Sequence, residues 1–170
     1  MDLKIFIRDI PDFPKPGILF KDITPLLASP EAFNRALTEM EKCVKPLHPD
    51  KILAVESRGF IFGGALAARM GVGFAPVRKP GKLPFTTIRE TYDLEYGKDS
   101  LEIHHDAIRS GENVVIVDDL LATGGTALAT VRLAEKLGAR VAGLVFLIEL
   151  EFLNGREKLK GYTVSSLIQF

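Results

Sequence analysis

The sequence predicts an α/β domain in which a central parallel sheet is flanked by helices. Short apolar segments with the length and composition of buried strands recur along the chain, at residues 52–55, 74–77, 114–117 and 141–148. Helical stretches separate several of these segments. Strands that alternate with helices build a parallel sheet with helices on both faces, and such sheets bind ligands at the carboxyl ends of their strands.

The predicted helices have recognisable ends. They are expected at residues 29–44, 60–70 and 126–137. Pro30 falls at the first position of the earliest helix, where a missing N–H group costs nothing. The other two helices are followed by Gly71 and Gly138, as helix C-termini prefer. The helix positions therefore agree with the alternation of the strands.

Two segments do not fit this alternation and are predicted to be irregular loops. Residues 11–25 are rich in proline, and residues 78–91 are basic and contain Pro80, Gly81 and Pro84. A loop as long as the second is uncommon inside a compact domain and usually serves as a lid or a binding segment.

The composition indicates one globular domain of 170 residues without export or membrane signals. Lysine plus arginine equals aspartate plus glutamate, at 22 each, so we expect no global attraction to nucleic acid or to acidic membranes. The longest apolar run, residues 141–148, is far shorter than the roughly 20 residues that span a bilayer. Residues 1–9 lack the pattern of a signal peptide. Cys43 is the only cysteine, which excludes a disulfide framework within the chain and favours the cytoplasm.

The most informative segment is the apolar strand that ends in Asp118 and Asp119 and enters a helix through a turn of small residues. Gly124 and Gly125 allow the backbone to turn tightly and to approach a ligand. The amides from Ala122 to Thr126 lack helical acceptors, and the hydroxyl groups of Thr123 and Thr126 add further donors. This turn is therefore predicted to bind a phosphate.

Asp118 and Asp119 would repel a bare phosphate, so their predicted partner is a different group. Ionised carboxylates only accept hydrogen bonds, and the hydroxyl groups of a vicinal diol can donate them. The pair is thus expected to bind ribose and to steady positive charge on the sugar during substitution. The alternative is an ordinary strand-to-helix turn with capping acids. The turn matches neither the Walker loop nor the dinucleotide-binding fingerprint.

Residues 118–126, Asp-Asp-Leu-Leu-Ala-Thr-Gly-Gly-Thr, resemble the phosphoribosyl pyrophosphate motif of the type I phosphoribosyltransferases, and in particular of members that use adenine. Other segments agree in the order of the family. Residues 13–25 are similar to its adenine-binding hood, residues 56–60 to its pyrophosphate loop, and residues 76–84 and 92–97 to its mobile catalytic loop. The resemblance implies a single domain over residues 1–170, with a hood at about 1–28 and a mobile loop at about 78–100.

Several cations are expected to neutralise the pyrophosphate. Arg58 follows a buried strand, and Arg78, Lys79 and Lys82 cluster on the long loop. The alternative for each of these residues is an ordinary side chain on a loop that is exposed to solvent and binds no ligand. The resemblance adds Tyr96 to this set and implies a non-proline cis peptide in the turn at Ser57 and Arg58.

The resemblance to the hood implies that Leu19, Phe20 and Lys21 bind adenine. The Phe20 ring could stack on a planar base, and the backbone around it could offer donors and acceptors to the edge of the base. The alternative is a phenylalanine of the core. Flanking prolines and Lys21 favour a rigid rim over a strand interior.

The family pattern places Glu95 on the loop that closes over the substrates and implies that it carries a proton in catalysis. Adenine loses a proton from its imidazole ring as N9 bonds to the sugar, and a nearby carboxylate can balance that change. Loop closure would also exclude water. A surface glutamate is the alternative.

The resemblance thus implies transfer of the phosphoribosyl group of phosphoribosyl pyrophosphate to adenine, giving AMP and pyrophosphate. Mg²⁺ is expected to bind mainly through the substrate oxygens, without a dedicated set of protein ligands. A homodimer is implied by the resemblance alone. The alternatives are a transferase for hypoxanthine, guanine or xanthine, and a sensor that binds phosphoribosyl pyrophosphate without turnover.

Overall fold

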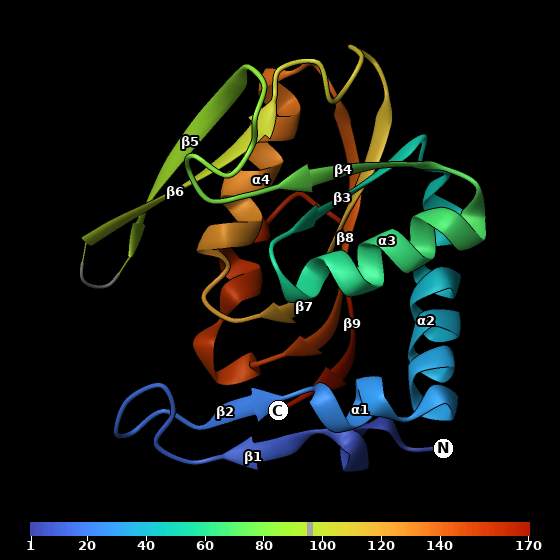
Figure 1. Ribbon diagram of the computed structural model, residues 1–170, viewed down its shortest axis with the longest axis vertical. Helices are drawn as coiled ribbons and strands as arrows, with labels where there is room; N and C mark the ends of the chain where they lie inside the picture. Colours follow the sequence, from blue (N-terminus) through green and yellow to red (C-terminus); the bar gives the residue numbers. More distant parts are fainter. Residues whose placement is uncertain (95–96) are drawn as a thin grey trace. The chain divides into compact units, whose positions relative to one another are not determined.

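The computed structural model describes residues 1–94 and 97–170, which form two compact units, Met1–Glu39 and Met40–Phe170 (Figure 1). The larger unit contains the parallel sheet that the sequence predicts. Glu95 and Tyr96, two of the predicted site residues, lie outside the described residues.

The larger unit is built on a five-stranded sheet with parallel pairing throughout. Its strands lie in the order β4 (Gly73–Val77), β3 (Lys51–Val55), β7 (Asn113–Leu121), β8 (Arg140–Glu149) and β9 (Val164–Gln169). The α/β class and the first four of these strands confirm the expectations from the sequence. Because the strands are parallel, their carboxyl ends lie at one edge of the sheet.

The fifth strand, β9, is not among those predicted from the sequence. Its middle holds Ser165 and Ser166, and Ile168 is its one buried residue. An edge strand pairs on one side and is half covered, so it does not need a continuous apolar run. β9 therefore lacks the apolar run that marks the other strands in the sequence.

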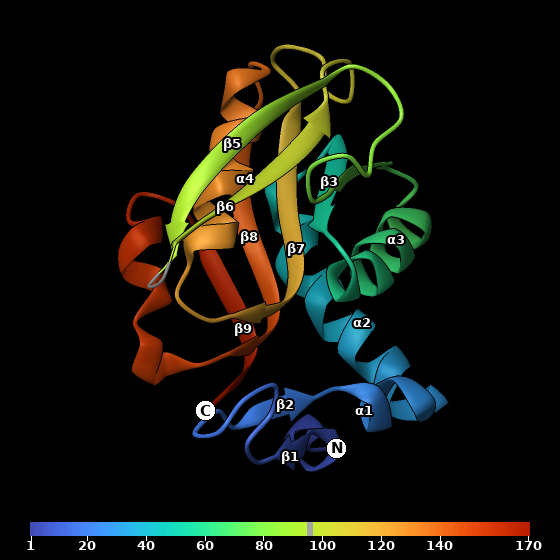
Figure 2. The ribbon, with the colours of Figure 1, turned by 60° about the vertical axis from the view of Figure 1, so that its left-hand side comes forward.

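Helices α3 (Arg58–Met70) and α4 (Gly125–Lys136) cover opposite faces of the sheet (Figure 2). Side chains alternate between the two faces along β3. Ala54 faces α3, where a Cβ atom on Gly63 would lie only 2.6 Å from the Ala54 Cβ. Leu53 belongs instead to the apolar core shared with Val131 of α4. Both helices confirm the predicted ones within two residues.

An antiparallel hairpin follows the basic loop. Its strands are β5 (Thr87–Leu94) and β6 (Gly97–His104), which pair from Thr87 opposite His104 to Leu94 opposite Gly97. The expectation that residues 78–91 are irregular throughout was therefore wrong from Thr87 onward. The last proline of the segment is Pro84, so nothing after it prevents strand pairing. Leu101 and Ile103 anchor the hairpin in the core.

The smaller unit contains a short two-stranded sheet. Its elements are η1 (Leu3–Phe6), β1 (Arg8–Ile10), β2 (Phe20–Asp22), α1 (Thr24–Ala28) and the first part of α2 (Pro30–Val44). The Arg8 guanidinium donates to the Asp22 carboxylate, with Nη2 to Oδ2 at 2.6 Å. The prediction of a loop over residues 11–25 was thus wrong at β2 and at the start of α1. A strand of three residues, such as β2, is too short to show a recognisable alternation of apolar and polar residues.

The remaining short elements of the larger unit are the 3₁₀ helices η2 (Lys45–Leu47), η3 (Glu151–Leu153) and η4 (Gly155–Leu159). Among the residues that the structure describes, no helix has the length and apolar character needed to cross a membrane.

Candidate active site

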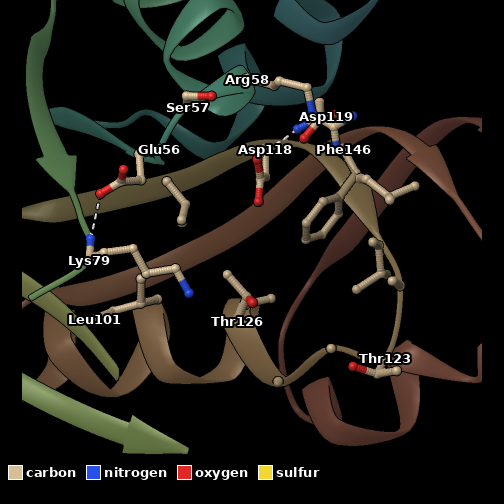
Figure 3. A pocket seen from close by; sticks show the side chains of 17 residues that line it. Glu56, Ser57, Arg58, Lys79, Leu101, Asp118, Asp119, Thr123, Thr126 and Phe146 are labelled. Atoms are coloured by element: carbon tan, nitrogen blue, oxygen red, sulfur yellow. Dashed lines mark hydrogen bonds and ion pairs between the residues drawn. The ribbon is translucent and has the colours of Figure 1, made fainter. Parts of the chain in front are cut away.

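The sheet contains a topological switch point between β3 and β7. The chain continues from β3 to β4 on one side and from β7 to β8 on the other. Crevices at such points, outside the carboxyl ends of the strands, are where open α/β sheets bind ligands. A pocket of about 260 Å³ lies there. Figure 3 shows the side chains around it.

One wall of the pocket is the turn between β7 and α4. Gly124 lies in the left-handed region with φ of +83°, a conformation that glycine adopts without strain. The first amides of a helix have no intrahelical acceptor, and no other acceptor in the described part of the chain takes those of Gly125 and Thr126. Residues 122–126 all line the pocket. The turn can therefore present several N–H donors to an anion.

Asp118 and Asp119 lie at the end of β7 and differ in their surroundings. The Asp119 carboxylate pairs with Arg58, with Nε to Oδ2 at 2.9 Å. Asp118 projects into the pocket, and its Oδ1 accepts the backbone amide of Asp119 at 2.9 Å (Figure 3). Burial raises the pKa of Asp118 well above its usual range, and the adjacent Asp119 charge adds to this effect. Burial also raises the pKa of Asp119, although Arg58 acts in the opposite direction.

The start of α3 approaches Asp118 closely. A Cβ atom at Gly59 would lie 2.6 Å from the Asp118 Oδ1, so this position has no room for a side chain. The cis peptide implied for the turn before α3 is present at the bond between Glu56 and Ser57. The turn brings Arg58 beside the acid pair.

The opposite wall carries Glu56 and Lys79. The Glu56 carboxylate accepts the Lys79 backbone amide and lies 3.4 Å from the Arg78 Nε. The Lys79 ammonium pairs with Asp99 on β6. Partial burial acts to lower the pKa of Lys79, but the hydrogen bond to Asp99 and nearby negative charge together raise it. Lys79 therefore stays a cation.

A hydrogen-bond chain joins this wall to the turn between β7 and α4, which is the predicted phosphate-binding turn. The Tyr92 hydroxyl lies 3.2 Å from the Asp99 Oδ2 and 3.2 Å from the Thr126 Oγ1. The buried Tyr92 ring also packs on Gly125, where a Cβ atom would lie 3.2 Å from its Cδ2. The hairpin is thus fastened to the first turn of α4.

The structure brings most of the predicted site residues of the larger unit into one pocket: Arg58, Lys79, Asp118, Asp119, Ala122, Thr123, Gly124, Gly125 and Thr126. Arg78 and Lys82 lie outside this lining within the described part of the chain. Arg78 packs over the Phe60 ring, with its Cζ 5.9 Å from the ring centroid. Its Nη1 donates to the Lys82 carbonyl at 3.4 Å.

The predicted base-binding residues belong to the smaller unit. Phe20 and Lys21 lie on β2, and Leu19 precedes it with half of its surface exposed. The Lys21 ammonium pairs with Asp9, with Nζ to Oδ1 at 2.6 Å. Phe20 packs edge to face on Phe13 at 5.2 Å between the ring centroids.

The pocket is also lined by Glu56, which the sequence placed in the pyrophosphate loop without a role of its own, and by Leu101 and Phe146, which the sequence did not single out. Glu56 had a usable signal, because it is the first polar residue after β3, as Asp118 is after the apolar part of β7. Leu101 and Phe146 lie within strands and are almost fully buried. No local pattern separates them from ordinary core residues.

No group of three or more histidine, cysteine or acidic side chains in the described residues is arranged to hold a metal ion. Asp118 and Asp119 are the adjacent carboxylates of the pocket, and Asp119 is already paired with Arg58. A divalent ion bound here would therefore need most of its oxygen ligands from a substrate.

Comparison with known proteins identifies relatives over the full chain. Residues 23–168 match the family model of the phosphoribosyl transferase domain. The adenine phosphoribosyltransferase of Carboxydothermus hydrogenoformans is 58% identical over 170 residues, which is 100% of both chains. The crystal structure of the adenine phosphoribosyltransferase from Thermoanaerobacter pseudethanolicus is 58% identical, with a TM-score of 0.97 over 99% of this chain and 98% of that one.

A more distant structure is that of the Saccharomyces cerevisiae adenine phosphoribosyltransferase in complex with an imino-altritol bisphosphate and adenine. It is 44% identical, with a TM-score of 0.89 over 95% of this chain and 94% of that one. The similarity thus extends over nearly the whole length of each chain compared.

Proposed function

The chain belongs to the phosphoribosyltransferase family. On this basis we propose the reaction that the protein catalyses and the part that each residue of the pocket plays in it. The enzyme transfers the phosphoribosyl group of phosphoribosyl pyrophosphate to adenine, in purine salvage, and the products are AMP and pyrophosphate. One observation supports the proposal above all. The turn between β7 and α4, with its free backbone amides, lies beside Asp118 and Asp119 and across the pocket from Lys79.

The turn from Ala122 to Thr126 binds the 5′-phosphate in this proposal. Its residues line the pocket at the start of α4, where free amides and the helix dipole favour an anion. The dipole contributes only about 0.3–1 kcal/mol at an exposed helix end, so hydrogen bonds from the amides and from the hydroxyls of Thr123 and Thr126 supply most of the binding.

Asp118 and Asp119 accept hydrogen bonds from the two ribose hydroxyls. Their negative charge also stabilises positive charge on the sugar ring as its anomeric carbon is substituted. Arg58 already balances Asp119 at 2.9 Å. When pyrophosphate binds, the same guanidinium lies between the acid pair and the leaving group.

Arg58 and Lys79 line the pocket and neutralise the pyrophosphate as it departs. Arg78 and Lys82 assist from the basic loop. Tyr96, which lies outside the described residues, is assigned to the same group by the resemblance. Lys79 is paired with Asp99 in this structure. We therefore expect the Lys79 ammonium to exchange this partner, at least in part, for a pyrophosphate oxygen.

Adenine binding is assigned to Leu19, Phe20 and Lys21. The bond between adenine N9 and the ribose C1′ forms while the bond from C1′ to the pyrophosphate oxygen breaks. The imidazole ring of adenine gives up one proton in this exchange, and Glu95 carries it.

We expect Mg²⁺ to bind mainly through phosphoribosyl pyrophosphate, in line with the small number of carboxylates in the pocket. Asp118 and Asp119 would hold the ion through water or through the sugar hydroxyls that they bind. When bound, the ion neutralises charge on the pyrophosphate.

A panel of bases tests the proposed reaction. The protein is incubated with phosphoribosyl pyrophosphate, magnesium and adenine, hypoxanthine, guanine or xanthine in turn, and pyrophosphate release is followed. Release with adenine alone is the expected result. Release with another purine would reassign the base, and binding of the ester without release for any base would favour a sensor.

We also propose a homodimer, which the resemblance implies, and a cytoplasmic location, which the single cysteine favours. One chain has a mass of 18.7 kDa. If the protein is a dimer, sedimentation equilibrium should give a molecular mass of about twice this value. A mass equal to that of one chain would contradict the dimer.

A further inference from the structure

The segment after β8, which is largely exposed but has Gly155 buried, supports the phosphate turn from outside the pocket. Gly155, at the start of η4, lies directly against it. A Cβ atom at Gly155 would lie 2.3 Å from the Ala122 carbonyl oxygen and 3.2 Å from the Gly124 amide nitrogen. A Cβ atom at Gly124 would in turn lie 2.5 Å from the Gly155 carbonyl oxygen. The two backbones are therefore in direct contact, without a side chain between them.

Arg156 and Glu149 hold this segment in place. Glu149 ends β8 and is buried, with 4% of its surface exposed. Its carboxylate accepts two hydrogen bonds from the Arg156 guanidinium, from Nε at 2.6 Å and from Nη2 at 2.7 Å. The Arg156 Nη1 donates to the Val164 carbonyl at 2.8 Å, and the Ser166 hydroxyl donates to Glu149 at 2.5 Å. One residue after Gly155, the chain is thus fixed to both β8 and β9.

The ends of the segment are anchored as well. The Leu150 amide donates to the carbonyl of Leu121, the last residue of β7, at 2.9 Å. Leu159, at the end of η4, is buried in the apolar core that includes Ala127 of α4. Movement of Gly155 away from the turn would therefore break contacts on both sides.

We propose that Gly155 and the Glu149–Arg156 ion pair are positioning residues that fix the geometry of the phosphate-binding turn. This inference rests on the proposed function, in which the turn binds the 5′-phosphate. None of the three residues lines the pocket among the described residues, so they act through the backbone of Ala122 and Gly124.

The physical reason is that amide donors bind an anion well only when they converge on it. A contact of 2.3 Å with a carbonyl oxygen cannot be relieved by rotation of a flexible side chain, since the neighbour is backbone. A methyl group at Gly155 would therefore push the turn, and the N–H groups of the turn would no longer point to one place.

Gly155→Ala is the first test, with Gly64→Ala as its matched control. A Cβ atom at Gly64 on α3 meets nothing within 4 Å, and this control should bind ligands as the natural protein does. Ribose 5-phosphate and magnesium pyrophosphate serve as probes in titration calorimetry. We expect Gly155→Ala to weaken ribose 5-phosphate binding about tenfold or more, with pyrophosphate binding changed far less.

Substitutions of Arg156 provide a second test in which no atom is forced into the turn. Arg156→Met removes both hydrogen bonds to Glu149, and Arg156→Lys keeps the charge but cannot bridge both carboxylate oxygens. We expect the KM for phosphoribosyl pyrophosphate to rise while the KM for adenine stays near its natural value. The lysine variant should lie between the methionine variant and the natural protein.

Equal weakening of ribose 5-phosphate and pyrophosphate binding in Gly155→Ala would indicate general collapse and would overturn the proposal. The proposal would also be overturned if Gly155→Ala bound both ligands with the affinity of the natural protein. Equal rises of the KM values for phosphoribosyl pyrophosphate and adenine in Arg156→Met would overturn it as well. Failure of the natural protein itself to bind ribose 5-phosphate would instead overturn the proposed function of the pocket.

Discussion

Asp118 and Asp119 follow each other in the chain but lie in different electrostatic surroundings. Asp119 has Arg58 as a partner, whereas Asp118 is partly buried beside another acid. A carboxyl group whose folded-state pKa lies above its ordinary value of 3.8 destabilises the fold as pH rises. The loss begins near the ordinary value and is complete above the raised one. Asp118 therefore lowers the stability of the ligand-free protein at neutral pH.

Asp118→Asn should for this reason raise the melting temperature of the ligand-free protein at pH 7. A gain of about 0.5–2 kcal/mol is reasonable for relief of a strained functional site. This corresponds to about 2–4 °C for each kcal/mol in a chain of this size. The gain should shrink as the pH falls toward 4, because Asp118 in the natural protein then takes up its proton.

Two comparisons test whether the charge of Asp118 destabilises the fold. Asp93→Asn changes a side chain that is 85% exposed and should leave the melting curve unaltered. Asp118→Asn should also bind ribose 5-phosphate more weakly, while free adenine binding is retained. If the melting temperature fails to rise at any pH, burial does not disfavour the Asp118 charge.

Glu95→Gln tests the proton carrier directly. The amide keeps the size of the side chain but cannot take up a proton, so turnover should fall by about 10² or more. Single-turnover measurements with adenine are needed, because slow product release would conceal a change in the chemical step. An unaltered rate of the chemical step would remove Glu95 from catalysis.

The β5–β6 hairpin is connected to the phosphate turn through Tyr92. Tyr92→Phe keeps the ring on Gly125 but removes the hydroxyl that lies between Asp99 and Thr126. Each such hydrogen bond contributes about 0.5–1.5 kcal/mol. Amide hydrogen exchange in β5 and β6 should therefore become faster by up to about tenfold for each bond lost.

Ser100→Ala is the control for this variant. It removes the exposed hydrogen bond between the Thr91 and Ser100 hydroxyls at 2.8 Å, in the same hairpin but away from Thr126. Exchange in β5 and β6 should stay close to that of the natural protein. If exchange in β5 and β6 became equally faster in both variants, the cause would be weaker pairing between the two strands. Loss of the contact between the hairpin and α4 would then not explain it.

The elements that the sequence predicts are those whose own residues determine their form. Residues 114–117 of β7 form a continuous apolar run because helices cover both faces of the sheet, and the acids and glycines after this run mark the site. β9 and β5 depend on a partner strand for their form, so local patterns missed them. The pocket roles of Leu101 and Phe146, and the contact of Gly155 with Gly124, arise from chain segments far apart in sequence. Only the folded chain reveals them.

At the scale of the whole molecule, the charges are balanced and anion binding depends on local groups. The net charge is zero, with 22 cationic and 22 anionic side chains. Arg58 and Lys79, at 34% and 42% side-chain exposure, are open to screening by salt, whereas the donors of the turn are neutral amides. In the proposed complex, cations that salt can screen would therefore bind the pyrophosphate, and neutral amides would bind the 5′-phosphate.

The division of the chain into two units leads to a prediction for a shortened protein. Every described residue that lines the pocket belongs to Met40–Phe170, which has its own sheet and core. Removal of residues 1–28 keeps Ser29, whose hydroxyl accepts the Ala32 amide at 3.2 Å at the start of α2. The shortened chain should still bind ribose 5-phosphate and pyrophosphate, as measured by calorimetry. It should lose turnover with adenine, because the residues proposed to bind the base, Leu19, Phe20 and Lys21, are removed.

Phe20→Ala in the full chain complements this experiment, since it leaves the rest of the chain in place. Loss of the stacking surface should weaken adenine binding by about 1–3 kcal/mol, if its stacking resembles that of other bases on aromatic rings. This corresponds to about 5- to 150-fold in the KM for adenine, with the KM for phosphoribosyl pyrophosphate little changed. Adenine turnover that survives removal of residues 1–28 would place the recognition of the base among residues 29–170. The assignment of Leu19, Phe20 and Lys21 to adenine would then be wrong, while the phosphate turn and its aspartates would keep their roles.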